Sequence, residues 1–167
     1  MSSRKGWHLI FSMEEKICSF FGHRDVNMTD RLYAMTTSEI VNAVELGYRT
    51  FYYGGYGDFD RLCHEIVTKI KNENPELKIR RLYCVSQERY LRKNVRYFNR
   101  EDYDEIIYLI PSFVGWYKSI YFRNCAMIDR SDLIIFYAER KEVSGAYKAY
   151  IYAKKRGDKQ IVNLWEI

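Results

Sequence analysis

A short aromatic run at residues 49–53 ends in a glycine-rich turn at residues 54–57, and a helical pattern follows. From Phe59 to Ile70 the apolar side chains recur three or four positions apart, which places them on one face of an α-helix. A strand that enters a helix through such a turn brings main-chain N–H groups close to a bound anion, and the helix dipole favours negative charge there. The segment therefore predicts a strand–turn–helix unit and points to a nucleotide phosphate. A tight turn alone would explain the glycines equally well.

Strand-like and helix-like patterns alternate along the whole chain, with short turn signals between them. This alternation predicts parallel crossover connections. We expect an α/β fold, a three-layer Rossmann-like open sheet that is mostly parallel, with about five strands and helices on both faces. The expected strands cover residues 17–21, 48–53, 78–85, 133–137 and 160–164, and the expected helices cover residues 29–46, 58–74, 116–128 and 144–156. Residues 103–111 are expected to form an extended or turn-rich connection, and the pattern is weakest at residues 86–102.

Length and composition favour one soluble unit. The 167 residues suit a single domain, residues 1–167, with its core at about residues 16–164. Hydrophobic residues make up 47% and charged residues 29%, and the net charge of +5 suits an anionic ligand but is low for a dedicated nucleic-acid-binding protein. No stretch is long and apolar enough for a signal peptide or a membrane span, so we expect a cytoplasmic protein without a membrane partner.

Cysteine and histidine spacing does not fit a metal site. Cys18, Cys63, Cys84 and Cys125 are scattered without a Cys-x-x-Cys pair, and three of them lie within apolar patterns, which predicts buried free thiols in a reducing compartment. The three histidines share no ligand spacing. We therefore expect neither a metal ion nor another cofactor.

Three polar loops follow expected strands: Gly22-His23-Arg24, residues 54–60, and the loop that leads to Ser144. In an open parallel sheet, ligands bind beyond the carboxyl ends of the strands, near the point where the strand order reverses. The three loops should therefore open on one rim of the sheet. Their convergence predicts a ligand site more strongly than any one loop does.

Four segments in this order resemble the SLOG superfamily: FGHR at residues 21–24, YGGYGDFD at 53–60, RNCAMIDRSD at 123–132 and SGAYKAYIYA at 144–153. This superfamily includes the "Lonely Guy" phosphoribohydrolases, the DNA-processing protein DprA and nucleotide-sensing domains of bacterial defence systems. The resemblance covers about residues 16–164 and is closest to small single-domain bacterial and phage members without an assigned activity. It implies the Rossmann-like fold and a nucleotide-derived ligand.

The resemblance leaves an enzymatic activity open. The hydrolases of the superfamily carry Pro-Gly-Gly-x-Gly-Thr-x-x-Glu, in which the threonine contacts phosphate and the glutamate serves glycosidic cleavage. Tyr53, Asp58 and Arg61 stand at the proline, threonine and glutamate positions of this chain. N-glycosidic cleavage needs a nearby carboxylate. The candidate catalytic carboxylates are therefore Asp58, Asp60 and Glu65.

The rim loops and the resemblance together define an expected ligand site. Phosphates would rest on residues 54–57 and the start of the next helix, with Arg24 and Arg123 as counter-charges, while a tyrosine such as Tyr56 could stack on the base. Asp58 or Asp60 would contact the sugar. The candidate binding residues are Gly22, His23, Arg24, Gly54, Gly55, Tyr56, Gly57, Asp58, Asp60, Arg123, Asn124, Ser144 and Gly145.

Structural roles compete with ligand contact at several of these positions. The alternatives are helix capping or dipole contacts by Asp58, Asp60 and Ser144, a structural hydrogen-bond pair of His23 with Arg24, and loop bracing by Arg123 with Asn124.

The expected function is the binding or sensing of a nucleotide or nucleotide-derived molecule, such as an ADP-ribose or NAD derivative. One alternative is a nucleoside-5'-monophosphate phosphoribohydrolase. Another is DprA-like binding of single-stranded nucleic acid through a stripe of basic residues, which would equally fit a solvated surface. That stripe comprises Arg89, Arg92, Lys93, Arg96 and Arg100. The sixteen tyrosines, nine phenylalanines and three tryptophans are compatible with a homo-oligomer interface.

Overall fold

A computed structural model describes residues 14–91, 98–141 and 143–167. Its centre is a six-stranded sheet in the order β4-β3-β2-β1-β5-β6, in which every neighbouring pair is parallel. The strands are β1 Ile17–Gly22, β2 Thr50–Tyr53, β3 Arg80–Val85, β4 Glu105–Tyr108, β5 Leu133–Tyr137 and β6 Gln160–Asn163. The predicted α/β class and Rossmann-like layering are confirmed, and the described strands number six rather than about five.

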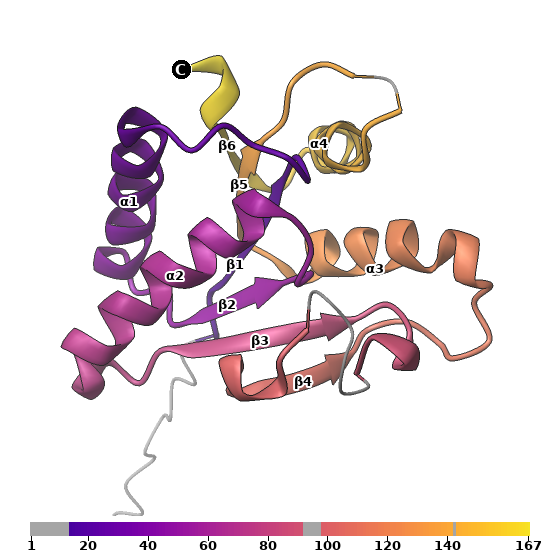
Figure 1. Ribbon diagram of the computed structural model, residues 1–167, viewed down its shortest axis with the longest axis horizontal. Coiled ribbons are helices and arrows are strands. Elements are labelled where there is room, and N and C mark those ends of the chain that lie inside the picture. The colour runs from indigo at the N-terminus through magenta and orange to yellow at the C-terminus, as the bar shows by residue number, and fades with distance from the viewer. Residues whose placement is uncertain (1–13, 92–97, 142) are drawn as a thin grey trace, which may run out of the picture.

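Two pairs of helices cover the two faces of the sheet (Figure 1). Helices α1 (Asp30–Glu45) and α2 (Asp58–Glu73) pack on one face, and α3 (Trp116–Arg130) and α4 (Gly145–Arg156) pack on the other. Successive side chains of β1 explain this arrangement, because Phe20 enters the first core and Phe21 the second. Strands buried on both faces therefore read as continuous apolar runs in the sequence.

The strand order reverses at β1. The chain passes from β1 through β2 and β3 to the β4 edge, and then returns to place β5 on the opposite side of β1. The carboxyl ends of β1 and β5 lie side by side, with Gly22 paired to Tyr137. Because the crossovers after these two strands run to opposite faces, the loops separate and leave a crevice at this point.

Strand β4 lies within residues 103–111, which were expected to form an extended or turn-rich connection and were not counted as a strand of the sheet. It is an edge strand of four residues, Glu105–Tyr108, whose side chains are exposed or half-buried. So short a segment lacks the buried apolar run that marked the inner strands. The preceding weak segment contains two separate 3₁₀ turns, Glu88–Leu91 and Arg100–Asp102, while residues 92–97 lie outside the described part.

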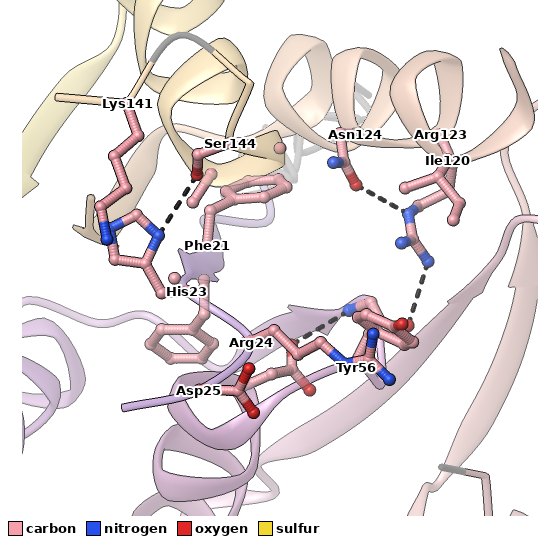
Figure 2. A pocket seen from close by; sticks show the side chains of 16 residues that line it. Phe21, His23, Arg24, Asp25, Tyr56, Ile120, Arg123, Asn124, Lys141 and Ser144 are labelled. Atoms are coloured by element: carbon pink, nitrogen blue, oxygen red, sulfur yellow. Dashed lines mark hydrogen bonds between the residues drawn. The ribbon is translucent and has the colours of Figure 1, made fainter. Parts of the chain in front are cut away.

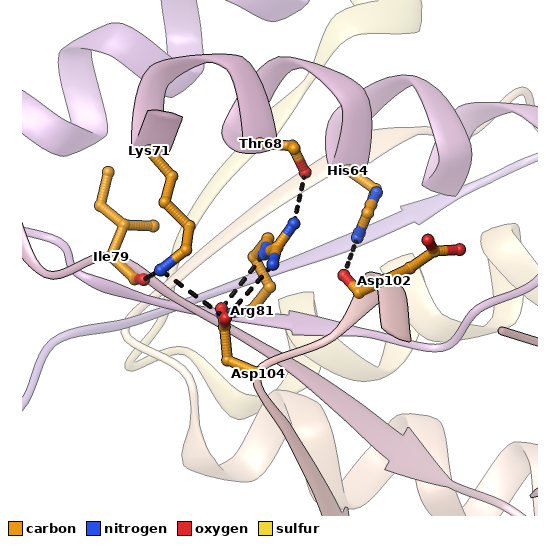
Figure 3. A network of polar contacts seen from close by, with 7 residues as sticks. All are labelled: His64, Thr68, Lys71, Ile79, Arg81, Asp102 and Asp104. Atoms are coloured by element: carbon orange, nitrogen blue, oxygen red, sulfur yellow. Dashed lines mark hydrogen bonds and ion pairs between the residues drawn. The ribbon is translucent and has the colours of Figure 1, made fainter. Parts of the chain in front are cut away.

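A polar network attaches this edge of the sheet to α2 (Figure 3). Asp104 accepts hydrogen bonds from Arg81 at its main-chain nitrogen (2.8 Å) and Nε (3.1 Å), and Arg81 also donates to Thr68 Oγ1 at 3.0 Å. Burial opposes ionisation of Asp104, but the hydrogen bonds from Arg81 outweigh it and lower the pKa of this carboxyl. His64 Nε2 lies 2.7 Å from the Asp102 carbonyl oxygen. These contacts fix the segment around residues 99–104 beside α2.

The four cysteines are buried and free. Within residues 14–91, 98–141 and 143–167, no helix has the length and apolar character that a membrane span needs.

Gly22 allows α2 to approach the end of β1. A Cβ atom at this position would lie 2.3 Å from Phe59 Cβ, far inside van der Waals contact. We expect Gly22→Ala to lower the free energy of unfolding by about 1–3 kcal/mol, because Phe59 must leave its packing position. Chemical denaturation measures the effect. Gly145→Ala is the control, since a Cβ there meets no atom within 4 Å. Equal stability of the two variants would contradict this account of the packing.

Candidate functional site

A cavity of about 470 Å³ opens at the reversal point of the sheet, between the loops after β1, β2 and β5 and the side of α3 (Figure 2). Ten of the thirteen predicted binding residues line it. The complete lining is Phe20, Phe21, Gly22, His23, Arg24, Asp25, Gly54, Tyr56, Asp60, Ile120, Arg123, Asn124, Lys141, Ser144, Gly145 and Ala146. The structure therefore brings the three predicted rim loops together around one space.

His23 holds two parts of this rim together. Its Nε2 accepts a hydrogen bond from the Glu139 main-chain N–H at 2.7 Å, so in the neutral ring Nδ1 carries the proton and donates to Ser144 Oγ at 3.2 Å. Burial and the nearby Lys141 lower the pKa of His23. The ring is therefore a neutral brace between the β1 loop and the start of α4 rather than a phosphate-binding cation. Its hydrogen-bond partners are Glu139 and Ser144, and not Arg24 as the structural alternative proposed.

The exposed positive charges at the cavity are Arg24 and Lys141. The Arg24 guanidinium lies over the Tyr56 ring, 4.9 Å from its centroid, and the Arg24 carbonyl accepts from the Asp58 N–H at 2.8 Å. Lys141 Nζ lies 2.8 Å from a Glu139 carboxylate oxygen. Tyr56 is 40% exposed and lines the cavity, so its side chain can contact a ligand there.

The glycine-rich turn at residues 54–57, the glycine bend, does not have the phosphate-binding role expected for it. The N–H groups of Gly54 and Gly55 donate to the two carboxylate oxygens of Asp60, at 3.2 and 3.1 Å. A phosphate therefore meets amides that already have an anionic partner. The structure does not support the expectation that these two amides hold a phosphate, because the first turn of α2 supplies its own carboxylate.

Arg123 fixes this bend from the side of α3. Its side chain is only 4% exposed, and Nη1 donates to the carbonyls of Gly54 (3.1 Å) and Cys84 (2.8 Å), while Nε donates to Asn124 Oδ1 at 2.9 Å. These contacts favour the bracing alternative for Arg123. Burial raises the pKa of Asp60 to about 7, although the Arg123 charge and the two amides oppose this shift. Asp60 is thus an acid that changes charge near neutral pH.

The start of α4 offers main-chain donors to the cavity. Ser144 is the N-cap of this helix, and its Oγ accepts from Tyr147 N–H at 3.3 Å. Gly145 and Ala146 follow in the first turn, where N–H groups have no acceptor within the helix. The helix dipole places partial positive charge at the same point. An anion at this end of the cavity would meet these donors.

Three predicted binding residues do not line this cavity. Gly55 and Gly57 line a second cavity, also of about 470 Å³, on the other side of the bend, and Asp60 borders both spaces. Asp58 follows the N-cap Gly57, and its carboxylate accepts from Val26 N–H at 3.0 Å, which ties the β1–α1 loop to α2. Among the candidate catalytic carboxylates, Glu65 is exposed and only Asp60 lines the first cavity.

Sequence reasoning missed six of the lining residues: Phe20, Phe21, Asp25, Ile120, Lys141 and Ala146. Asp25, Lys141 and Ala146 are each adjacent to a predicted loop residue or lie in a predicted loop, so the rule that located the loops could have included them. The basic stripe is not a single helix face in the described residues, because Arg89 and Arg100 lie in separate 3₁₀ turns. Arg92, Lys93 and Arg96 lie outside the described residues.

Comparison with known proteins identifies the fold class. No family model and no curated protein matches the sequence. Among solved structures, the chain is similar to DNA processing protein A (DprA) from Streptococcus pneumoniae, with 12% identity and a TM-score of 0.59 over 88% of this chain and 49% of DprA. It is also similar to the structural-genomics target TM1055, with 12% identity and a TM-score of 0.55 over 87% of this chain and 72% of that one.

This protein thus spans about half the length of DprA. Its fold is similar to that of DprA and TM1055, which confirms the Rossmann-like fold that the sequence motifs predicted.

Proposed function

We propose that this protein binds a nucleotide or nucleotide-derived small molecule in the cavity at the reversal point of the sheet. The convergence of the β1, β2 and β5 loops with the start of α4 around about 470 Å³ is the observation that carries this proposal. Small-molecule sites in proteins occupy about 300–1,000 Å³ and occur at this position in open α/β sheets. Molecules related to ADP-ribose or NAD belong to the proposed ligand class.

The donors and charges suggest how the ligand lies. A phosphate would sit against the N–H groups of Gly145 and Ala146, with Arg24 and Lys141 supplying positive charge. The face of Tyr56 would contact the base. The ligand's sugar would lie toward the glycine bend. This orientation moves the phosphate from the predicted position at residues 54–57 to the start of α4.

Calorimetric titration tests the proposal with AMP, ADP-ribose, cyclic ADP-ribose and NAD as probes. We expect at least one probe to bind, and Ser144→Asp to weaken it by about tenfold or more, because the new carboxylate faces the ligand phosphate. Ser144→Asn is the matched control, since both residues cap a helix well but only aspartate adds charge. The absence of binding by all four probes, or equal affinities of the two variants, would overturn the proposal.

A second candidate function is hydrolysis of a nucleoside monophosphate to a free base and ribose phosphate. The favouring observation is Asp60, a buried carboxyl at the cavity wall with a pKa of about 7. Such a group can donate or accept a proton at neutral pH. Chromatographic detection of free base from AMP, lost in Asp60→Asn, would select this function over binding alone.

A further inference from the structure

The bend at Gly54 and Gly55 has the geometry of an anion site. Two successive N–H groups point to the same acceptor, and Gly55 takes a backbone φ of +69°, which glycine adopts readily. The first turn of α2 and the buried guanidinium of Arg123 add positive potential. A carboxylate or a phosphate could satisfy these donors.

In this protein the anion is part of the chain. Asp60 lies in the first turn of α2, is only 7% exposed, and uses one oxygen for each of the two amides. In its ionised form, which prevails above the pKa of about 7, the carboxylate offers about four acceptor positions, so the two amides leave the others available. Because Asp60 also borders the cavity, the remaining acceptor positions of its carboxylate can accept hydrogen bonds from a ligand there.

We propose that Asp60 determines the specificity of the cavity by occupying the amide pair of the bend, so that it excludes a phosphate there and selects a ligand group that donates hydrogen bonds. This inference rests on the proposed nucleotide site and specifies which end of the ligand faces the bend. A hydroxyl or amino group can donate to Asp60, and the ribose hydroxyls of a nucleotide are groups of this kind. A second phosphate at the bend would meet the carboxylate at close range and be repelled.

The test asks whether removal of the carboxylate creates a phosphate site. Inorganic phosphate is titrated into ¹⁵N-labelled wild-type protein and into Asp60→Ala, and the amide signals of Gly54 and Gly55 are followed by NMR. We expect these signals to shift to saturation in Asp60→Ala, with an affinity at least about tenfold higher than in the wild type. Asp60→Asn keeps the side-chain shape without the charge, and we expect it to show a smaller gain.

Asp25→Ala is the matched control, because it removes another carboxylate from the cavity lining but leaves the bend amides bonded to Asp60. A phosphate site that appears in Asp25→Ala as strongly as in Asp60→Ala would overturn the inference, as would the absence of any gain in both Asp60 variants. The nucleotide proposal is tested separately, because the Ser144 variants change AMP binding at the other end of the cavity. AMP binding that depends on Ser144, without a phosphate gain in the Asp60 variants, would contradict only the specificity role.

Discussion

Replacement of Arg123 by alanine is expected to lower the free energy of unfolding by about 3–5 kcal/mol, because a buried ionic group and its bonds are removed together. Arg123 is 4% exposed, and its guanidinium donates to the main-chain carbonyls of Gly54, which directly follows β2, and Cys84, which lies next to the last residue of β3. Without it, both carbonyls lose a donor and Asp60 loses a positive charge that favours its ionised form. Denaturant unfolding followed by circular dichroism measures the loss.

Lys118→Ala is the control for this prediction. Lys118 lies on the same helix but is exposed, and its Nζ lies 5.6 Å from the centroid of the Tyr117 ring. We expect its removal to change stability by less than about 0.5 kcal/mol, as for most surface substitutions. Similar losses in the two variants would show that Arg123 does not brace the bend as described.

Lowering the pH from 8 to 5 is expected to stabilise the wild type by about 3 kcal/mol relative to Asp60→Asn. Burial raises the folded-state pKa of Asp60 from 3.8 to about 7, so folding favours the protonated acid. This stabilisation is complete below the unfolded-state pKa, near pH 4, and is lost as the pH rises through the folded-state pKa, near pH 7. Asparagine has no such proton to release.

The measurement is the free energy of unfolding of both proteins at several pH values between 5 and 8. Subtracting the Asp60→Asn curve cancels the contributions of the other titrating groups to a first approximation. Parallel curves would contradict the described environment of Asp60.

The layers of the fold could be predicted because their signals are local. Two local patterns each indicated one buried element: the helical spacing from Phe59 to Ile70 and the apolar run Leu133–Tyr137. Both elements formed where expected. Strand β4 was missed because its four residues are exposed or half-buried. Its place in the sheet depends on pairing with β3 and on the Arg81–Asp104 contact, neither of which the local pattern contains.

The location of the cavity was predictable, but the contacts around it were not. Parallel strands place their following loops at one edge, so Gly22, Gly54 and Ser144 could be expected around one space. The role of His23 depends on Glu139 and Ser144, which lie 116 and 121 positions away in the sequence. The occupation of the bend amides by Asp60 likewise depends on side-chain geometry, which spacing alone cannot provide.

A crystal structure of the protein soaked with AMP tests the central claim most directly. We predict that the phosphate lies within hydrogen-bond distance of the Gly145 and Ala146 main-chain nitrogens, while Asp60 remains bonded to Gly54 and Gly55. A phosphate bound to the Gly54 and Gly55 amides, or AMP bound only outside this cavity, would contradict the account.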